Sequence, residues 1–311
     1  MGHNMNNILT ICLNPSIDRK IFLDEFKVGE LNRTKMAEID SAGKGLNVAS
    51  TLKKLGENVT LSGFMFLEDK GQFEDKLLNE DIEYSFVYAE GRARNNIKIT
   101  SGNTLTEINE SGNEVSTALQ EELIYLVEKL VDDKDGIILS GSLPCGVSDS
   151  YYFSLIENVS PKTKIIVDTE GEKLLNCLKK GIYLIKPNLY ELESIVNEKL
   201  KTKKDMVKSC RTLIEKGAEN VLLSLGENGA LLVNERESFY APAPKIDCKY
   251  SVGAGDKMLA AAVRSLLSGS SLKSTVRRAV AYGTYYCAYG DESLDENKLE
   301  ELISKIKSIR I

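Results

Sequence analysis

Two apolar segments, Gly136-Ile-Ile-Leu-Ser140 and Lys164-Ile-Ile-Val-Asp168, flank a helical window at Asp149–Glu157, and together they decide the fold class. Short runs that are apolar throughout are typical of strands buried on both faces of a sheet. A strand, a helix and a second strand in this order form a unit with parallel strands and a right-handed crossover. The sequence therefore predicts an α/β fold around a mostly parallel central sheet flanked by helices.

The same alternation continues on both sides of this unit. Apolar runs predict further strands, and apolar residues at helical spacing predict further helices. The strand candidates are Ile8–Leu13, Val59–Phe64, Tyr183–Lys186 and Val221–Leu225. The helical windows are Gly45–Leu55, Gln120–Val131, Leu189–Asn197, Lys204–Lys216, Asp256–Leu267, Ser271–Tyr289 and Asp295–Ile309. Six prolines in 311 residues mark no linker, so we expect a single domain over residues 1–311.

Two stretches break this alternation. Polar and apolar residues alternate in Arg19–Phe26 with Arg33–Asp40, and again in Ile82–Tyr88 with Asn96–Thr100 and Thr104–Asn109. This pattern is typical of antiparallel strands that are covered on one face only. We expect a small inserted β-sheet lid, from about 19–40 and 82–110, that closes over a ligand, pairs with a second subunit, or does both.

The composition excludes several classes of function. A net charge of −6, from 40 basic and 46 acidic side chains, argues against nucleic acid or an anionic membrane as a partner. The chain has one histidine, His3, near its start. This argues against a Ser-His-Asp hydrolase and against a histidine-ligated metal site. The six cysteines form no C-x-x-C pair, and no apolar run is long enough to span a bilayer. We therefore expect a cytoplasmic protein with free thiols.

The strongest local signal for chemistry is Ser251-Val-Gly-Ala-Gly-Asp256, which precedes a helical stretch. Glycines around a small residue let backbone N–H groups converge, and the positive end of the helix adds to them. Such a turn suits a transferring phosphoryl group, and Asp256 could accept the proton of an attacking hydroxyl. By itself, the segment is more typical of a glycine-rich turn with an aspartate cap.

A second glycine pair, Ser41-Ala-Gly-Lys-Gly-Leu-Asn47, also precedes a predicted helix. Lys44 can pair with a phosphate, and Asn47 can hydrogen-bond a hydroxyl. Neither segment is a Walker loop, because G-x-x-x-x-G-K-[ST] is absent. Asn14-Pro-Ser-Ile-Asp18 follows the first strand in place of G-x-G-x-x-G, which argues against a dinucleotide-binding fold.

With these segments, the chain resembles the ribokinase/PfkB family of sugar kinases over nearly its whole length. The motifs that carry the resemblance, in family order, are Asn14-Pro-Ser-Ile-Asp18, Ala42-Gly-Lys-Gly-Leu-Asn47-Val-Ala, Gly141-Ser-Leu-Pro-Cys-Gly146, Lys186-Pro-Asn-Leu-Tyr-Glu191, Ser224-Leu-Gly-Glu-Asn-Gly229 and Val252-Gly-Ala-Gly-Asp256. The opening motif resembles the branch that acts on sugars already carrying a phosphate. The resemblance implies a ribokinase-like fold, ATP and Mg²⁺ as cofactors, and a homodimer formed through the lid.

The resemblance also implies a role for each matching residue. Asp256 matches the catalytic base, and Gly253, Ala254 and Gly255 match the anion hole. The residues that match the sugar-phosphate site are Asp18, Arg33, Gly43, Lys44, Asn47, Arg94 and Asn96. The residues that match the nucleotide site are Lys186, Ser224, Gly226, Gly229, Gly253 and Gly255. Asn188 and Glu191 match a pair that holds Mg²⁺ through water, whereas Arg92 and Lys98 are interpreted as solvated surface side chains.

The first hypothesis is ATP-dependent phosphorylation of a ketohexose monophosphate, fructose 1-phosphate to fructose 1,6-bisphosphate. A tagatose 6-phosphate kinase, or a non-catalytic sensor of sugar phosphates or nucleotides on the same fold, stays open. The chain departs from the family pattern at Ala42, Ala93, Glu170 and Lys257, and in the segment 64–68. Lys257 could lower the pKa of Asp256 through its charge, or it could point away into solvent.

Overall fold

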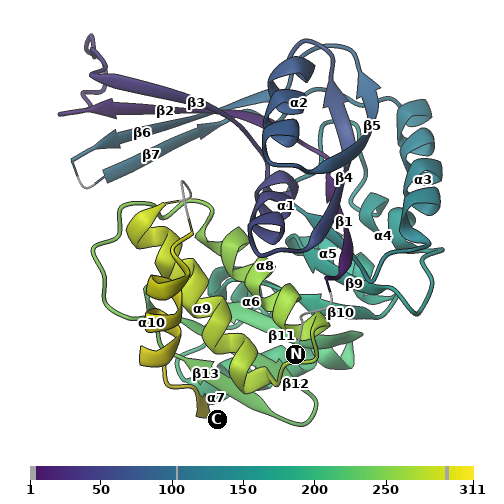
Figure 1. Ribbon diagram of the computed structural model, residues 1–311, viewed down its shortest axis with the longest axis vertical. Coiled ribbons are helices and arrows are strands. Elements are labelled where there is room, and N and C mark those ends of the chain that lie inside the picture. Colours follow the sequence, from purple (N-terminus) through teal and green to yellow (C-terminus); the bar gives the residue numbers. More distant parts are fainter. Residues whose placement is uncertain (1–4, 103, 291–293) are drawn as a thin grey trace.

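The computed structural model describes residues 5–102, 104–290 and 294–311, so His3 lies outside the described residues. Within these ranges ten strands form one large sheet, in the order β14-β13-β12-β11-β10-β9-β8-β1-β4-β5 (Figure 1). Their bounds are β1 (Asn7–Cys12), β4 (Asn58–Phe66), β5 (Glu83–Ala89), β8 (Gly136–Ser140), β9 (Lys164–Asp168), β10 (Ile182–Ile185), β11 (Ala218–Ser224), β12 (Ala230–Asn234), β13 (Ser238–Ala241) and β14 (Ile309–Arg310). From β5 to β11 the pairing is parallel, and β12 to β14 continue it antiparallel.

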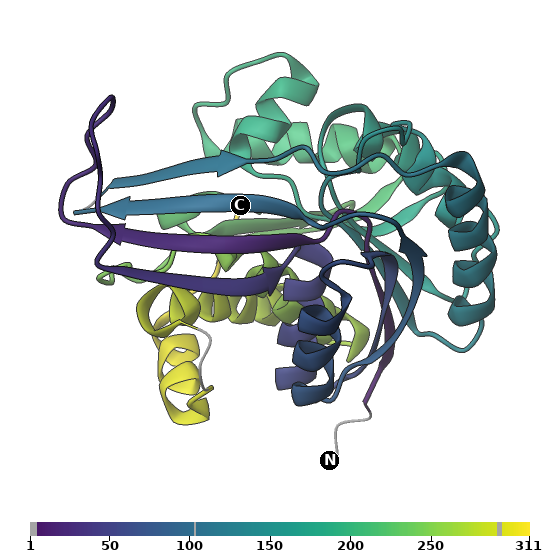
Figure 2. The ribbon, with the colours of Figure 1, turned by 90° about the horizontal axis from the view of Figure 1, so that it is seen from above.

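Helices cover both faces of this sheet (Figure 2). One layer contains α1 (Lys44–Lys54), α2 (Lys70–Asn79), α8 (Ala254–Leu267), α9 (Leu272–Tyr289) and α10 (Glu296–Lys305). The other contains α3 (Thr117–Val131), α4 (Tyr151–Ile156), α5 (Gly171–Leu178), α6 (Leu189–Val196) and α7 (Lys203–Glu215). A mostly parallel sheet between two helical layers confirms the predicted α/β fold class.

The centre of the sheet is apolar on both faces because helices cover both. All five residues of β8 are buried, and so are the last four residues of β9. The two strands run parallel with Ser140 opposite Asp168, so their polar last residues meet at one edge. The carboxyl ends of parallel strands are where α/β folds place their ligands, and the chemistry of this chain gathers at the same edge.

A second, smaller sheet extends from the body and is called the lid sheet below (Figures 1 and 2). Its strands, in the order β3-β2-β6-β7, are β2 (Ser16–Leu23), β3 (Met36–Ala42), β6 (Arg94–Ser101) and β7 (Thr104–Asn109). β2 with β3 and β6 with β7 form antiparallel hairpins, whereas β2 and β6 pair in parallel. The expectation of purely antiparallel pairing is therefore wrong at the centre of the lid sheet.

The placement of Ile82–Tyr88 in the lid is also wrong. β5 pairs in parallel with β4 at the edge of the large sheet, with Thr60 opposite Glu83. An edge strand is covered less completely than a central one. Polar and apolar residues can therefore alternate along it, as they do in a sheet with one solvated face. Glu83 is exposed and Ser85 is half-buried, so polar residues alternate here with Tyr84 and Phe86 and produce the misleading pattern.

No helix among the described residues combines the length and the apolar character needed to cross a membrane.

Candidate active site

Asp256 lies in the first turn of α8 and is buried. Its Oδ2 accepts a hydrogen bond of 2.9 Å from Nδ2 of Asn47, which projects from α1. Burial raises the pKa of Asp256, and the nearby charge of Asp168 raises it further against the opposing charge of Lys44. The two glycine-rich motifs, far apart in the sequence, therefore meet at one carboxylate whose proton affinity is increased.

Asp168, the last residue of β9, organises the cations next to this carboxylate. Its Oδ1 lies 3.1 Å from Nζ of Lys186, and its Oδ2 lies 3.8 Å from Nζ of Lys44. Burial acts to raise the pKa of Asp168, but both lysines and a hydrogen bond from Ser140 outweigh it, and the pKa lies below its usual value. In turn, the charge of Asp168 raises the pKa of Lys44. One buried carboxylate thus holds two ammonium groups in place.

The glycine-rich turn brings the start of α8 close to one of these cations. Gly253 is the N-cap of α8 and has φ of 93°, a left-handed conformation that favours glycine. A Cβ atom placed on Gly255 would lie 3.4 Å from Nζ of Lys186. The first turn of a helix leaves backbone N–H groups without helical acceptors. Together with Lys186, this turn forms an environment suited to an anion.

Asn188 and Glu191 form a capping box at the start of α6. The backbone N–H of Asn188 donates to Oε2 of Glu191 at 2.9 Å, and that of Glu191 donates to Oδ1 of Asn188 at 2.9 Å. Burial raises the pKa of Glu191. Asn188 also bridges to Ser224 at the end of β11, just before Gly226 and Gly229. The predicted metal and nucleotide residues therefore follow two neighbouring strands.

Asp18 is the polar centre of the lid sheet. Its Oδ1 accepts hydrogen bonds from Ser16 Oγ at 2.9 Å and from Asn96 Nδ2 at 3.0 Å. Its Oδ2 pairs with the ammonium group of Lys98, whose side chain is only 12% exposed. The interpretation of Lys98 as a solvated surface residue is therefore wrong, because the parallel pairing of β2 and β6 brings it onto the face that carries Asp18.

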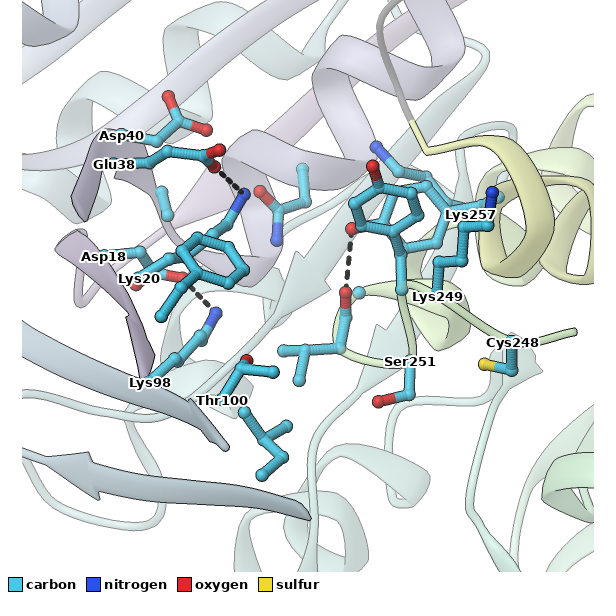
Figure 3. Close-up of a pocket in the computed structure, with 18 of the residues that line it drawn as sticks. Asp18, Lys20, Glu38, Asp40, Lys98, Thr100, Cys248, Lys249, Ser251 and Lys257 are labelled. Carbon is cyan, nitrogen blue, oxygen red and sulfur yellow. Dashed lines mark hydrogen bonds and ion pairs between the residues drawn. The ribbon is translucent and has the colours of Figure 1, made fainter. Parts of the chain in front are cut away.

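A pocket of about 600 Å³ separates the lid sheet from the segment that precedes α8. Figure 3 shows lid side chains such as Asp18 and Lys98 on one side and Lys249 and Ser251 on the other. Five lysines line this pocket: Lys20, Lys76, Lys98, Lys249 and Lys257. Lys20, Lys76 and Lys98 pair with carboxylates that also line the pocket, so the lining contains charges of both signs.

Other predicted sugar-site residues lie at different distances from this pocket. Asn47 lines it, whereas Gly43 is the N-cap of α1 behind it. Arg94 is half-buried and donates to the carbonyl oxygen of Asn14 at 3.3 Å. Arg33 is exposed in the turn between β2 and β3 and does not line the pocket. Lys44 lies beside Lys186 at Asp168, so it belongs with the cations near the start of α8.

The structure contradicts both expectations for Lys257. The residue is 3% exposed, and its ammonium group lies 5.2 Å from the centre of the Tyr286 ring. Tyr286 in turn donates from its hydroxyl to the carbonyl oxygen of Val252 at 2.9 Å. Lys257 therefore does not extend into solvent, and the pKa of Asp256 is raised rather than lowered.

Sequence reasoning did not identify several polar residues at this site. Asp168 and Ser140 end two buried strands, and a polar residue in that position is the signal that could have marked them. Ser50 lies on α1 after Asn47 and lines the pocket, and its buried Oγ has no hydrogen-bond partner among the described residues. Lys20 and Lys76 look like ordinary surface lysines in the sequence, and only the fold brings them together.

Known proteins resemble this chain over most of its length. Residues 12–294 match the family described as pfkB family carbohydrate kinase. The chain is 36% identical to 1-phosphofructokinase of Escherichia coli (strain K12) over 276 residues, 88% of each chain. It is 35% identical to D-tagatose-1-phosphate kinase of Bacillus licheniformis over 302 residues, 96% of this chain and 98% of that relative.

A solved structure gives the same result for the fold. Phosphofructokinase-2 from Escherichia coli in complex with fructose-6-phosphate superimposes with a TM-score of 0.87 and 26% sequence identity. The match covers 96% of this chain and 99% of that one, which confirms the predicted ribokinase-like fold. The family motifs occur in the order of the family, the fold matches a solved structure, and the relatives match over most of their length. The chain therefore belongs to the pfkB family of carbohydrate kinases.

Proposed function

We propose that the protein transfers the γ-phosphoryl group of ATP to a hydroxyl of a ketohexose monophosphate. The observation that carries this proposal is the buried Asp256, placed between the glycine-rich turn of α8 and the hydrogen bond from Asn47. Asp256 takes the proton of the attacking hydroxyl on the carboxylate oxygen that Asn47 does not occupy. Its raised pKa increases its affinity for that proton.

The anion-binding side of the site stabilises the transferring group. Gly253, Ala254 and Gly255 place the start of α8 against the phosphoryl oxygens, and Lys186 and Lys44 supply positive charge. Asp168 holds both lysines before substrate arrives, so little reorganisation is needed during the reaction. The segment from Ser224 through Gly226 to Gly229 follows the nucleotide from the neighbouring strand.

Asn188 and Glu191 fit a hydrated magnesium ion. They offer amide and carboxylate oxygens, the hard donors that magnesium prefers, and they lie near the lysines that would meet the phosphates. Among the described residues no group of three or more acidic, cysteine or histidine side chains forms a metal cage, so the protein would hold the ion through water. When bound, Mg²⁺ supplies positive charge to the phosphate oxygens.

The pocket under the lid sheet is where we place the sugar phosphate. Asp18, Asn96 and Asn47 offer acceptors and donors for hydroxyls, and the lysines of the lid sheet, Lys20 and Lys98, offer charge to the existing phosphate. Arg94 lies at the base of the lid sheet and would add to this charge. Closure of the lid over the sugar excludes water from the transferring group.

The activities for which two relatives are named favour a sugar that carries its phosphate at C1. The E. coli relative is a 1-phosphofructokinase, and the B. licheniformis relative is a D-tagatose-1-phosphate kinase. Fructose and tagatose differ only in configuration at C4, so the same base and anion site would serve both. Fructose 1-phosphate is the first candidate substrate, and tagatose 1-phosphate is the second.

A coupled assay of ADP release with ATP and Mg²⁺ tests this proposal. Fructose 1-phosphate, tagatose 1-phosphate, fructose 6-phosphate, tagatose 6-phosphate and unphosphorylated fructose are compared at matched concentrations. We expect the highest kcat/KM for one of the two 1-phosphates. A higher value for a 6-phosphate would overturn the assignment of the sugar. Absence of turnover with every sugar, while ATP still binds, would favour the non-catalytic sensor.

We also propose a homodimer formed through the outer face of the lid sheet. One row across the four strands contains Ile39, Arg19, Ile97 and Ile108 on the face opposite Lys20 and Lys98. Ile39 and Ile108 are each 54% exposed. An amphipathic sheet with one face toward a polar pocket and apolar residues on the other is typical of a surface that pairs with a second copy.

A further inference from the structure

Two cysteines meet at the edge of the candidate active site. Cys248 lies in residues 242–253, the segment that joins β13 to α8, and Cys287 lies on α9. Cys248 is close enough to Cys287 to raise the pKa of its thiol. The backbone N–H groups of Lys249 and Tyr250 both donate to the carbonyl oxygen of Cys287, at 2.8 and 3.1 Å. The main chain therefore holds the two cysteines beside each other.

The pair is accessible, and the segment that carries Cys248 packs on α9 through non-covalent contacts. Cys248 is exposed and Cys287 is partly exposed, whereas Cys12, Cys177 and Cys210 are buried. Tyr250 packs against the end of α9, with its ring 6.2 Å from that of Tyr286. A small oxidant can reach the pair, and the hydrogen bonds from Lys249 and Tyr250 to the carbonyl oxygen of Cys287 already keep the two cysteines adjacent, as a disulfide requires.

We propose that Cys248 and Cys287 form a reversible disulfide on exposure to a peroxide, and that this bond slows phosphoryl transfer by restraining the segment before α8. The thiolate of Cys248 attacks a peroxide oxygen and breaks the O–O bond, which gives a sulfenic acid and, from hydrogen peroxide, water. The sulfur of Cys287 then attacks the sulfenic sulfur, and its proton leaves with the hydroxyl as a second water. A dithiol reductant restores both thiols.

Cys248 is the thiol that reacts first. It is the more exposed of the two, and burial together with the neighbouring Cys248 raises the pKa of Cys287 to about 12. Cys287 therefore stays protonated at neutral pH until its partner has been oxidised. This order is the usual one for a reactive cysteine with a resolving cysteine beside it.

The bond would act on the site because Cys248 lines the pocket, on the same segment as Ser251 and Gly253 (Figure 3). This segment forms the wall opposite the lid sheet and ends at the anion-binding turn. A covalent bond to α9 fixes the wall in one position. The lid then closes on a surface that cannot adjust to the substrate, which lowers turnover.

Mass spectrometry tests the bond itself. The protein is treated with hydrogen peroxide, its remaining thiols are alkylated, and it is digested with trypsin. We expect peptide 246–249 to be linked to peptide 279–298, and the link to disappear after reduction with a dithiol. Cys145→Ser, which removes an exposed cysteine elsewhere, should keep the link, and Cys287→Ser should lose it. An oxidised or alkylated Cys248 beside an unlinked Cys287 in the wild-type protein would overturn the proposal.

Kinase assays of the same samples test the effect on turnover. Wild type and Cys145→Ser should lose most of their kcat with peroxide and recover it with a dithiol, whereas Cys287→Ser should keep its kcat in peroxide. If protein in which all Cys248 is linked to Cys287 keeps its full kcat, the proposed effect of the disulfide on turnover is wrong. The mass measurement does not depend on kinase activity, so failure of the proposed sugar substrate and failure of the disulfide are distinguishable.

Discussion

Asp256 is the residue on which the proposed chemistry depends most directly. Asp256→Asn keeps the size of the side chain and an oxygen for the hydrogen bond from Asn47, but it cannot accept the proton. We expect kcat to fall about 100- to 10,000-fold, the usual contribution of a general base. The dissociation constants of ATP and sugar phosphate, measured by calorimetry, should stay within a few-fold of wild type. Unchanged turnover would remove Asp256 from the role of base.

Asp168 sets the pH at which Asp256 works. Because Asp256 must be ionised, kcat should fall as the pH falls through its raised pKa. Asp168→Asn removes a negative charge that raises this pKa and frees Lys44 and Lys186, whose charges lower it. The acidic limb of a kcat–pH profile should therefore move to lower pH in the variant. A limb that moves to higher pH would contradict this coupling, and circular dichroism at each pH controls for unfolding.

Gly255 tests the anion site without touching the base. A methyl group there would lie 3.4 Å from Nζ of Lys186, in the space that a phosphate needs. Because a misplacement of about 1 Å can cost about 100-fold, we expect Gly255→Ala to lower kcat/KM for ATP roughly tenfold. Thermal stability should not fall, since alanine favours a helix by about 1 kcal/mol over glycine.

Gly71→Ala is the matched control for that variant. Gly71 also lies in a helix, α2, and a Cβ atom there meets no other atom within 4 Å. Its kcat/KM should equal that of wild type. Equal activity of both variants would mean that the gap beside Lys186 does not receive a phosphate.

At the scale of elements, the junction of β3 and α1 is tightly packed. Gly43 has φ of 137°, and a Cβ atom there would lie 2.8 Å from Sγ of Cys12. Gly43→Ala should therefore cost more stability than Gly56→Ala, where φ is 86° but a Cβ atom meets nothing within 4 Å. The strained backbone alone costs about 1–3 kcal/mol. Urea unfolding measures both, and equal losses would show that contact with Cys12 does not matter.

The elements that the sequence predicts well are those with continuous apolar patterns. β8 and β9 have the predicted bounds, because each contains a short continuous apolar run, 137–139 and 165–167, bounded by other residue types. α2 and α5 were not predicted, and neither was the hairpin of β12 and β13. α2 buries only Phe73 and Leu77, so its apolar pattern is too sparse to mark a helix.

The site was predictable where a motif is local and unpredictable where it is assembled from separate strands. Asp256 and Asn47 stand next to glycine pairs that mark helix starts. Lys98 is different, because its contact with Asp18 exists only through the parallel pairing of β2 with β6. Neither the charge of a lysine nor its neighbours in the sequence contain that information.

At the scale of the whole molecule, the lid sheet should determine the oligomeric state. The double substitution Ile39→Lys and Ile108→Lys would place two charges in the apolar row on the outer face of the lid sheet. We expect wild type to sediment as a dimer at micromolar concentration and the double variant to sediment as a monomer. Leu78→Lys, at a position 67% exposed on α2, is the control and should remain dimeric. A monomeric wild type would refute the dimer.

The parallel pairing at the centre of the lid sheet also sets an order of assembly. β3, α1, β4, α2 and β5 all lie between β2 and β6 in the chain. During synthesis, the edge of β2 that pairs with β6 stays unpaired until residues 94–101 have left the ribosome. By that time β1, β4 and β5 are available to pair with one another. Pairings with a large sequence separation form late because they close the longest loops. The lid sheet is thus completed after β1, β4 and β5 are available, and before β8 emerges to pair with β1.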